Sequence, residues 1–176
     1  MRTLTSVSVA LAMLLIGCGE PEGAAPTAFV AEFQHAGVPV PSGAHLSGAS
    51  EVPANDSDAR GQAIFLASGD AIRFRLQVAN IENVLQAHIH LAAAGANGPI
   101  VAWLYPPAPP AQLIPDAFNG TLGEGTLTAA NLMGPLAGMT IQDLLDAMRA
   151  GDTYVNVHTS QFPPGEIRGQ IRVRGR

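Results

Sequence analysis

Three histidines are the residues of this sequence whose type and spacing suit a chemical role. His88 and His90 are separated by one residue in the apolar run 86–91, and His158 lies in a second run, 154–159. Alternate side chains of a β-strand point to the same face, so His88 and His90 share one face of a strand. Neutral imidazole is the commonest metal ligand in proteins, and three imidazoles suit zinc or copper. The spacing therefore predicts a metal site at His88, His90 and His158.

Two glutamates extend this site. Glu51 and Glu166 are expected near the histidine strands, as additional metal ligands or as hydrogen-bond partners of the ligands. By the same alternation, Asn156 shares the face of His158, and Arg168 shares that of Glu166. The alternative is a hydrogen-bonded network of these polar side chains and the three histidines, and a buried arginine–glutamate pair could replace a metal altogether. Both interpretations stay open at this level.

The metal interpretation has a pH consequence. Binding is expected to weaken below about pH 6, because imidazole protonates near its reference pKa of about 6.5 and the proton competes with the metal. The remaining histidines, His35 and His45, lie outside the motif strands and are expected to be solvated.

Composition excludes several classes of function. The 176-residue chain has a net charge of −5, and all nine of its basic residues are arginine. The absence of lysine excludes Schiff-base catalysis by a lysine. No basic cluster is large enough to follow a phosphate backbone, so nucleic acid is not an expected partner. The single cysteine, Cys18, excludes an intramolecular disulfide and leaves the folded domain without a thiolate ligand.

The N-terminus has the pattern of an export signal. Residues 1–17 contain Arg2 followed by a short apolar segment, and they end in Leu-Ile-Gly before Cys18. This ending resembles the lipobox of bacterial lipoproteins, although an ordinary signal peptide with an incidental cysteine is the alternative. The resemblance implies a diacylated Cys18 that tethers the protein to an extracytoplasmic membrane surface. Residue 19 is glycine and not aspartate, which resembles lipoproteins that are sorted to the outer membrane, if the host has one. Residues 18–28 then form a linker, and 29–176 a single β domain.

The body of the chain is punctuated by 19 glycines and 14 prolines, which favours short strands. In 72–78, apolar and polar residues alternate, so one sheet face meets water and the pairing is antiparallel. The segment 37–43 is expected to be extended or loop because it contains two prolines. Strands are expected at 29–33, 45–50, 62–66, 72–78, 84–91, 100–105, 118–127, 154–158 and 166–173.

One short helix is expected at about 140–150. Thr140 can cap it, four apolar residues follow at helical spacing, and Gly151 suits its C-terminal end. The fold class is therefore all-β: an antiparallel sandwich or Greek-key barrel of about eight strands with this single helix.

Several motifs together resemble the CHRD domain, named for chordin. They are Leu-Ser-Gly-Ala-Ser-Glu-Val-Pro at 46–53, Ala-His-Ile-His at 87–90 with Asn-Gly-Pro-Ile-Val at 97–101, Tyr-Val-Asn-Val-His-Thr at 154–159, and Gly-Glu-Ile-Arg-Gly-Gln-Ile at 165–171. The resemblance covers approximately residues 44–173. It implies an extracytoplasmic β domain of the kind found in chordin-like animal proteins and in many bacterial secreted proteins, without a settled activity.

The sequence favours a non-enzymatic binding module, tethered to a membrane through Cys18, whose ligand is a metal ion, a protein or a matrix component. A metalloenzyme similar to copper–zinc superoxide dismutase is one alternative, but that family needs more histidines, an aspartate and usually a disulfide. A structural or protein-interaction domain built on a His/Glu/Arg hydrogen-bond network is the other. A serine hydrolase is disfavoured because the chain contains no Gly-x-Ser-x-Gly motif.

Overall fold

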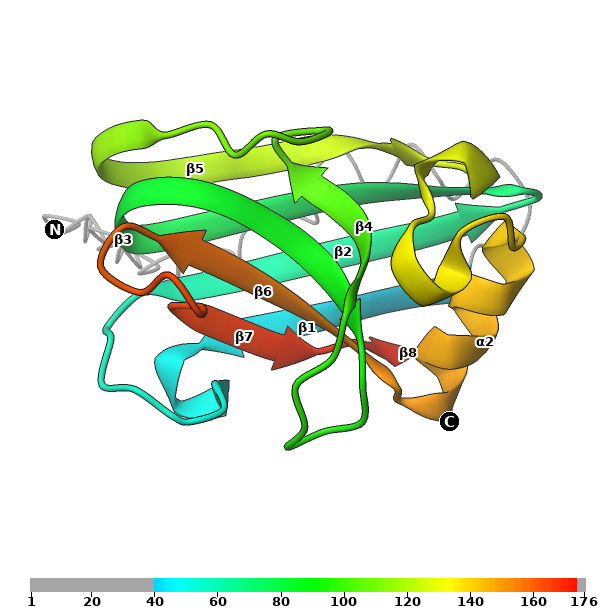
Figure 1. The fold of residues 1–176 in the computed structure, drawn as a ribbon, viewed down its shortest axis with the longest axis horizontal. Helices are drawn as coiled ribbons and strands as arrows, with labels where there is room; N and C mark the ends of the chain where they lie inside the picture. The colour runs from blue at the N-terminus through cyan, green and yellow to red at the C-terminus, as the bar shows by residue number, and fades with distance from the viewer. Residues whose placement is uncertain (1–39, 174–176) are drawn as a thin grey trace, which may run out of the picture.

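The computed structural model describes residues 40–173, in which eight strands form one antiparallel sheet. The strand order is β2-β1-β7-β6-β3-β4, and β2 also pairs with β3, so β1, β2, β3, β6 and β7 close into a barrel. β5 pairs with β3, and β8 pairs with β1. This architecture confirms the predicted all-β barrel (Figure 1). The strands are β1 Val40–Ser47, β2 Arg60–Ser68, β3 Ala71–Leu91, β4 Ile100–Tyr105, β5 Ile114–Leu127, β6 Thr153–Thr159, β7 Ile167–Gln170 and β8 Arg172–Val173.

β3 is the longest strand and joins two segments that were predicted as separate strands. Its first half pairs with β2 and β5, and its second half with β4 and β6. Between the halves, Asn80 and Asn83 have φ angles of 55° and 51°. Asparagine tolerates this left-handed region better than most residues, so the chain bends here without ending the strand. The bend lets one continuous strand serve both ends of the molecule.

β1 also differs from its prediction. The strand begins at Val40 and includes Pro41, because a proline near the start of a strand disturbs few ladder hydrogen bonds. It ends at Ser47, where the short 3-10 helix η1 (Gly48–Ser50) begins. The turn brings Glu51 back over the sheet, where its side chain is buried. The predicted segments 1–17, 18–28 and 29–33 lie outside the described residues.

The predicted helix is confirmed as α2 (Ile141–Ala150), after the 3-10 turns η2 (Ala129–Asn131) and η3 (Gly134–Leu136). The Thr140 side chain accepts a hydrogen bond from the backbone N–H of Asp143, and Gly151 closes the helix with a φ of 82°. The apolar face of α2 is buried in the core at one end of the barrel (Figure 1). No helix within residues 40–173 is long and apolar enough to cross a membrane.

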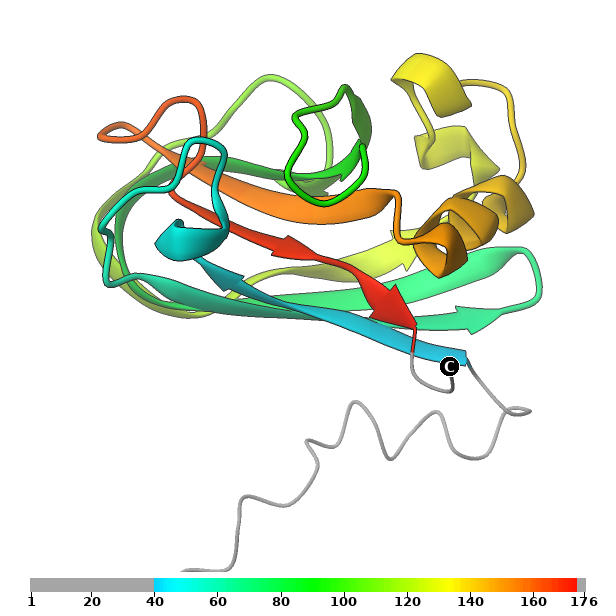
Figure 2. The same ribbon diagram turned by 90° about the horizontal axis from the view of Figure 1, so that it is seen from below.

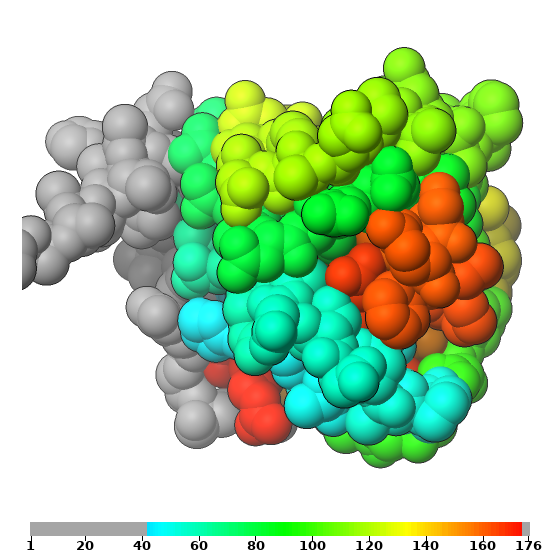
Figure 3. Space-filling view, turned by 90° about the vertical axis from the view of Figure 1, so that its left-hand side faces the viewer, coloured from blue at the N-terminus to red at the C-terminus, as the bar shows by residue number. Residues whose placement is uncertain are grey.

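Both faces of the central strands β3, β6 and β7 are covered. On the inner face, Ala87, Ile89, Val155, Val157 and Ile167 belong to the hydrophobic core. On the outer face, three loops lie over the strands: residues 48–58, 92–99 and 160–165 (Figure 2). Figure 3 shows the first and last of these loops side by side at the surface. The outer-face side chains of these strands, His88, His90, Tyr154, Asn156, His158 and Arg168, form a polar stripe that is therefore buried instead of facing water.

Candidate metal centre

The three predicted histidines meet on the outer face of β3 and β6. These strands are direct antiparallel neighbours, in which His158 lies opposite Gln86 and His88 lies opposite Asn156. The ring centroids are 5.7 Å apart for His88 and His90, 5.1 Å for His88 and His158, and 6.1 Å for His90 and His158. One nitrogen from each ring lies within 4.8 Å of those of the other two. Within residues 40–173, these three form the single such group of ligand residues.

Backbone carbonyls orient two of the rings. His90 Nδ1 lies 2.9 Å from the carbonyl oxygen of Gly98, and His158 Nδ1 lies 2.9 Å from that of Pro163. A carbonyl oxygen can only accept a hydrogen bond, so each Nδ1 donates its hydrogen and the lone pair is left on Nε2. The lone pair of His158 faces His88, whose Nδ1 lies 3.3 Å from His158 Nε2. Two rings are thus held in the tautomer that a metal ligand bound through Nε2 requires.

Two imidazole nitrogens of the group have no hydrogen-bond partner. His88 Nε2 and His90 Nε2 are both buried and unpaired. A complete hydrogen-bonded network would satisfy them, since buried polar atoms are normally paired. His88 Nδ1 lies 3.3 Å from His158 Nε2, within hydrogen-bond distance, so a metal that takes the His158 lone pair would replace this hydrogen bond.

Burial keeps the three imidazoles neutral. Desolvation lowers the pKa of His88 to about 3, and repulsion from His158 and His90 acts in the same direction. Desolvation also lowers the pKa of His90 to about 4, against the hydrogen bond to Gly98. The pKa of His158 is lowered by the same cause. Neutral rings keep their lone pairs available, and the lowered pKa values move the expected competition by protons to lower pH than the sequence alone indicates.

The two glutamates lie beside the group and tie the covering loops to the sheet. Glu51 accepts a hydrogen bond of 2.6 Å from Asn156 Nδ2. Burial raises the pKa of Glu51 to about 7, against the attraction of Arg168. Glu166 accepts hydrogen bonds from the hydroxyls of Ser57 at 2.7 Å and Thr159 at 2.6 Å. Neither carboxylate belongs to the group of ligand atoms formed by the histidines.

Arg168 and Tyr154 support the site in a way that sequence reasoning missed. The Arg168 guanidinium carbon lies 3.4 Å from the centroid of the Tyr154 ring, and this ring stacks on His90 with centroids 4.8 Å apart. Arg168 donates hydrogen bonds to Asn97 Oδ1 and to the Ala96 carbonyl, whereas the side-chain partners of Glu166 within residues 40–173 are Ser57 and Thr159. The parity of Tyr154 with His158 was the signal available in the sequence.

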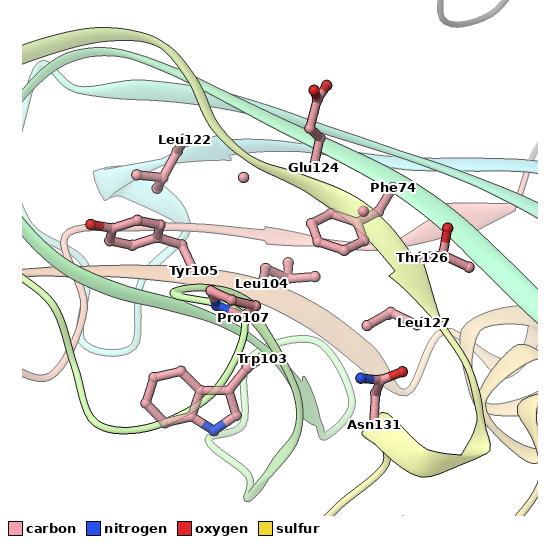
Figure 4. Close-up of a pocket in the computed structure, with 12 residues that line it drawn as sticks. Phe74, Trp103, Leu104, Tyr105, Pro107, Leu122, Glu124, Thr126, Leu127 and Asn131 are labelled. Atoms are coloured by element: carbon pink, nitrogen blue, oxygen red, sulfur yellow. The ribbon is translucent and has the colours of Figure 1, made fainter.

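Trp103 contacts the histidine group and also lines a neighbouring cavity. It lies opposite His88 on β4, and the two rings meet edge to face with centroids 4.3 Å apart. Trp103 also lines a cavity of about 360 Å³ between β4 and β5, together with Phe74, Leu104 and Leu122 (Figure 4). The only tryptophan of the chain therefore reports directly on the surroundings of His88. His45 is exposed on β1, as predicted, and His35 lies outside the described residues.

The family model of the CHRD domain matches residues 42–171, which is most of the chain. The chain belongs to the CHRD domain family. The match confirms the sequence-based resemblance and its extent. All three clustered histidines, both glutamates and Arg168 lie within the CHRD match, and Cys18 lies outside it. No curated protein and no solved structure matched this chain. The CHRD domain supports a binding or interaction module as its function.

Proposed function

We propose that this CHRD domain binds a transition metal ion, copper or zinc, through His88, His90 and His158. The observation that supports the proposal most strongly is the pair of buried, unpaired ring nitrogens in a group of three neutral imidazoles. Neutral imidazole nitrogens are good ligands for both metals. The low exposure of the rings, 0% for His88, 8% for His90 and 7% for His158, favours holding an ion over admitting a substrate.

A hydrogen-bonded network without metal accounts for these nitrogens less well. Each buried polar atom left without a partner costs about 1–3 kcal/mol. The network therefore leaves His88 Nε2 and His90 Nε2 as uncompensated costs in the folded state. A metal bound through His90 Nε2 would use a lone pair that the network leaves idle, and the carbonyls of Gly98 and Pro163 would support His90 and His158 as outer partners.

A metal titration tests the proposal. Zinc or cuprous copper at micromolar concentration should bind with one equivalent per chain, measured by elemental analysis after desalting. Copper should also quench the fluorescence of Trp103, because its ring contacts His88. His158→Ala should abolish tight binding, whereas His45→Ala, at an exposed histidine on β1, should leave it unchanged. No uptake of either metal, or equal binding without His158, would refute the proposal and leave the network as the role of these residues.

We also propose that the domain is held at an extracytoplasmic membrane surface by lipid on Cys18. Support comes from the lipobox-like sequence 15–18. Expression in a bacterial host should give a protein that partitions into detergent and whose mass includes acyl chains. The Cys18→Ser variant should lose both properties. An acylated, detergent-partitioning Cys18→Ser protein would contradict the anchor.

A further inference from the structure

Arg168 is a buried cation whose hydrogen bonds go to a loop. Its side chain is 2% exposed, and it donates to Asn97 Oδ1 at 2.9 Å and to the Ala96 carbonyl at 2.7 Å. Burying a guanidinium is costly unless its donors are satisfied and its charge is compensated. The contact with the face of Tyr154 and the attraction of Glu51 supply part of that compensation. Arg168 is therefore buried, despite this cost, at the position where its hydrogen bonds hold residues 96 and 97.

Residues 96 and 97 directly precede the residue that orients His90, a candidate metal ligand. Gly98 follows Asn97, and its carbonyl accepts the Nδ1–H of His90. The N–H of the same glycine donates to the Tyr154 hydroxyl at 3.3 Å. Tyr154 in turn stacks on the His90 ring with an interplanar angle of 8°. Arg168 and Tyr154 together hold both the acceptor of His90 and the plane of its ring.

We propose that Arg168 is a positioning residue for His90. Acting through the loop 95–99 and Tyr154, it holds His90 in the tautomer and orientation that bind a metal through Nε2. This inference rests on the proposed metal-binding function and names the device that prepares one of its ligands. Without the Gly98 carbonyl in place, the hydrogen of His90 is free to move to Nε2, and the lone pair no longer faces the group. His158 is anchored by Pro163 of a different loop and should be unaffected.

An arginine suits this role better than a lysine. The planar guanidinium donates to two acceptors at fixed angles while its face lies on an aromatic ring. A lysine ammonium is a compact point charge that cannot reproduce the flat contact with Tyr154. The positioning should therefore be only partly restored in Arg168→Lys.

Arg168→Met and a matched control on the same strand test the inference. Gln170 also anchors this loop from β7, by donating to the Ala92 carbonyl at 3.0 Å and to the Gly151 carbonyl at 2.6 Å, and neither hydrogen bond is to the segment 96–98 that adjoins His90. Histidine tautomers are read by long-range ¹H–¹⁵N NMR of the metal-free protein, and zinc affinity is measured by competition with a chelator. Arg168→Met should shift His90 to a mixture of tautomers, leave His158 in its Nδ1–H form, and weaken zinc binding by about ten- to a hundredfold. Gln170→Met should change neither reading.

Two results would overturn the inference. One is an Arg168→Met protein in which His90 keeps its tautomer and zinc affinity is unchanged. The other is an equal change at His90 and His158, which would mean that Arg168 only stabilises the fold. If Arg168→Met does not fold, Tyr154→Phe keeps the stacked ring, removes the hydroxyl bonded to Gly98, and should shift the His90 tautomer in the same direction. If the wild type takes up no metal but the His90 tautomer shifts as expected, the proposed function fails and the positioning role stands.

Discussion

Acidification should destabilise the metal-free domain through its buried histidines. The folded-state pKa is about 3 for His88 and about 4 for His90, because burial disfavours the charged ring. In the unfolded chain the pKa of histidine is about 6.5. Below that value the unfolded state binds protons that the folded state refuses, so the free energy of unfolding falls as the pH falls toward 4. His158 contributes in the same direction.

The expected net loss from His88, His90 and Glu51 together is about 2 kcal/mol, because Glu51 offsets about half of what the two histidines contribute. Between about pH 7 and about pH 5, linkage gives about 2 kcal/mol for each of His88 and His90. Glu51 opposes this loss, because burial raises its pKa to about 7 from its ordinary value of 4.5. The folded state then binds a proton on Glu51 that the unfolded state releases between pH 4.5 and about 7, so acidification within that window favours folding through this group.

Urea denaturation of the metal-free protein in the presence of a chelator measures the effect at about pH 7 and about pH 5. His88→Gln and His90→Gln should each remove about 2 kcal/mol of the pH dependence. Glu51→Gln should increase the loss on acidification, because it deletes the opposing group. A stability that is flat between these pH values, or a His88→Gln variant with the full slope, would refute the linkage between these buried rings and stability.

Three further predictions concern the fold. Gly165→Ala should destabilise the domain by about 1–3 kcal/mol in thermal or urea unfolding. The reason is that Gly165 has a φ of 141° and that a Cβ there would collide with Asn156. A variant as stable as wild type would contradict this close approach. Leu76→Asp should cost about 3–5 kcal/mol by burying an unpaired charge, and Gln77→Asp on the outward face under about 1 kcal/mol; equal losses would show the strand faces to be wrong. Thr140→Ala should cost about 1 kcal/mol by removing the N-cap of α2, with its circular dichroism otherwise unchanged, and no loss of stability would mean that the cap is dispensable.

Local sequence patterns were sufficient for most of the fold. The alternation of residues 72–78 predicted the buried and outward faces of β3, and Thr140 with Gly151 bounded α2. These features depend on neighbours a few residues apart, which the sequence displays directly. The continuity of β3 through Asn80 and Asn83 was not predicted, because left-handed asparagines also end strands and only the pairing partners on both sides keep this strand intact.

For the site, the sequence by itself determined which residues share a face. The His-x-His spacing placed His88 and His90 together, and parity placed Asn156 and His158 on one side of β6. Alternation follows from backbone geometry alone, so no knowledge of the rest of the chain was needed.

Only the tertiary structure decided what these side chains meet. The polar stripe is buried because three loops cover it, and the Gly98 and Pro163 carbonyls in two of those loops select the ring nitrogens that face the group. Glu51 lies 105 residues from its partner Asn156, and Arg168 lies 72 residues from its partner Ala96, so these contacts depend on how the loops cross the sheet. Loop closure and packing determine which residues far apart in the chain become hydrogen-bond partners. Such contacts leave no periodic pattern in the sequence.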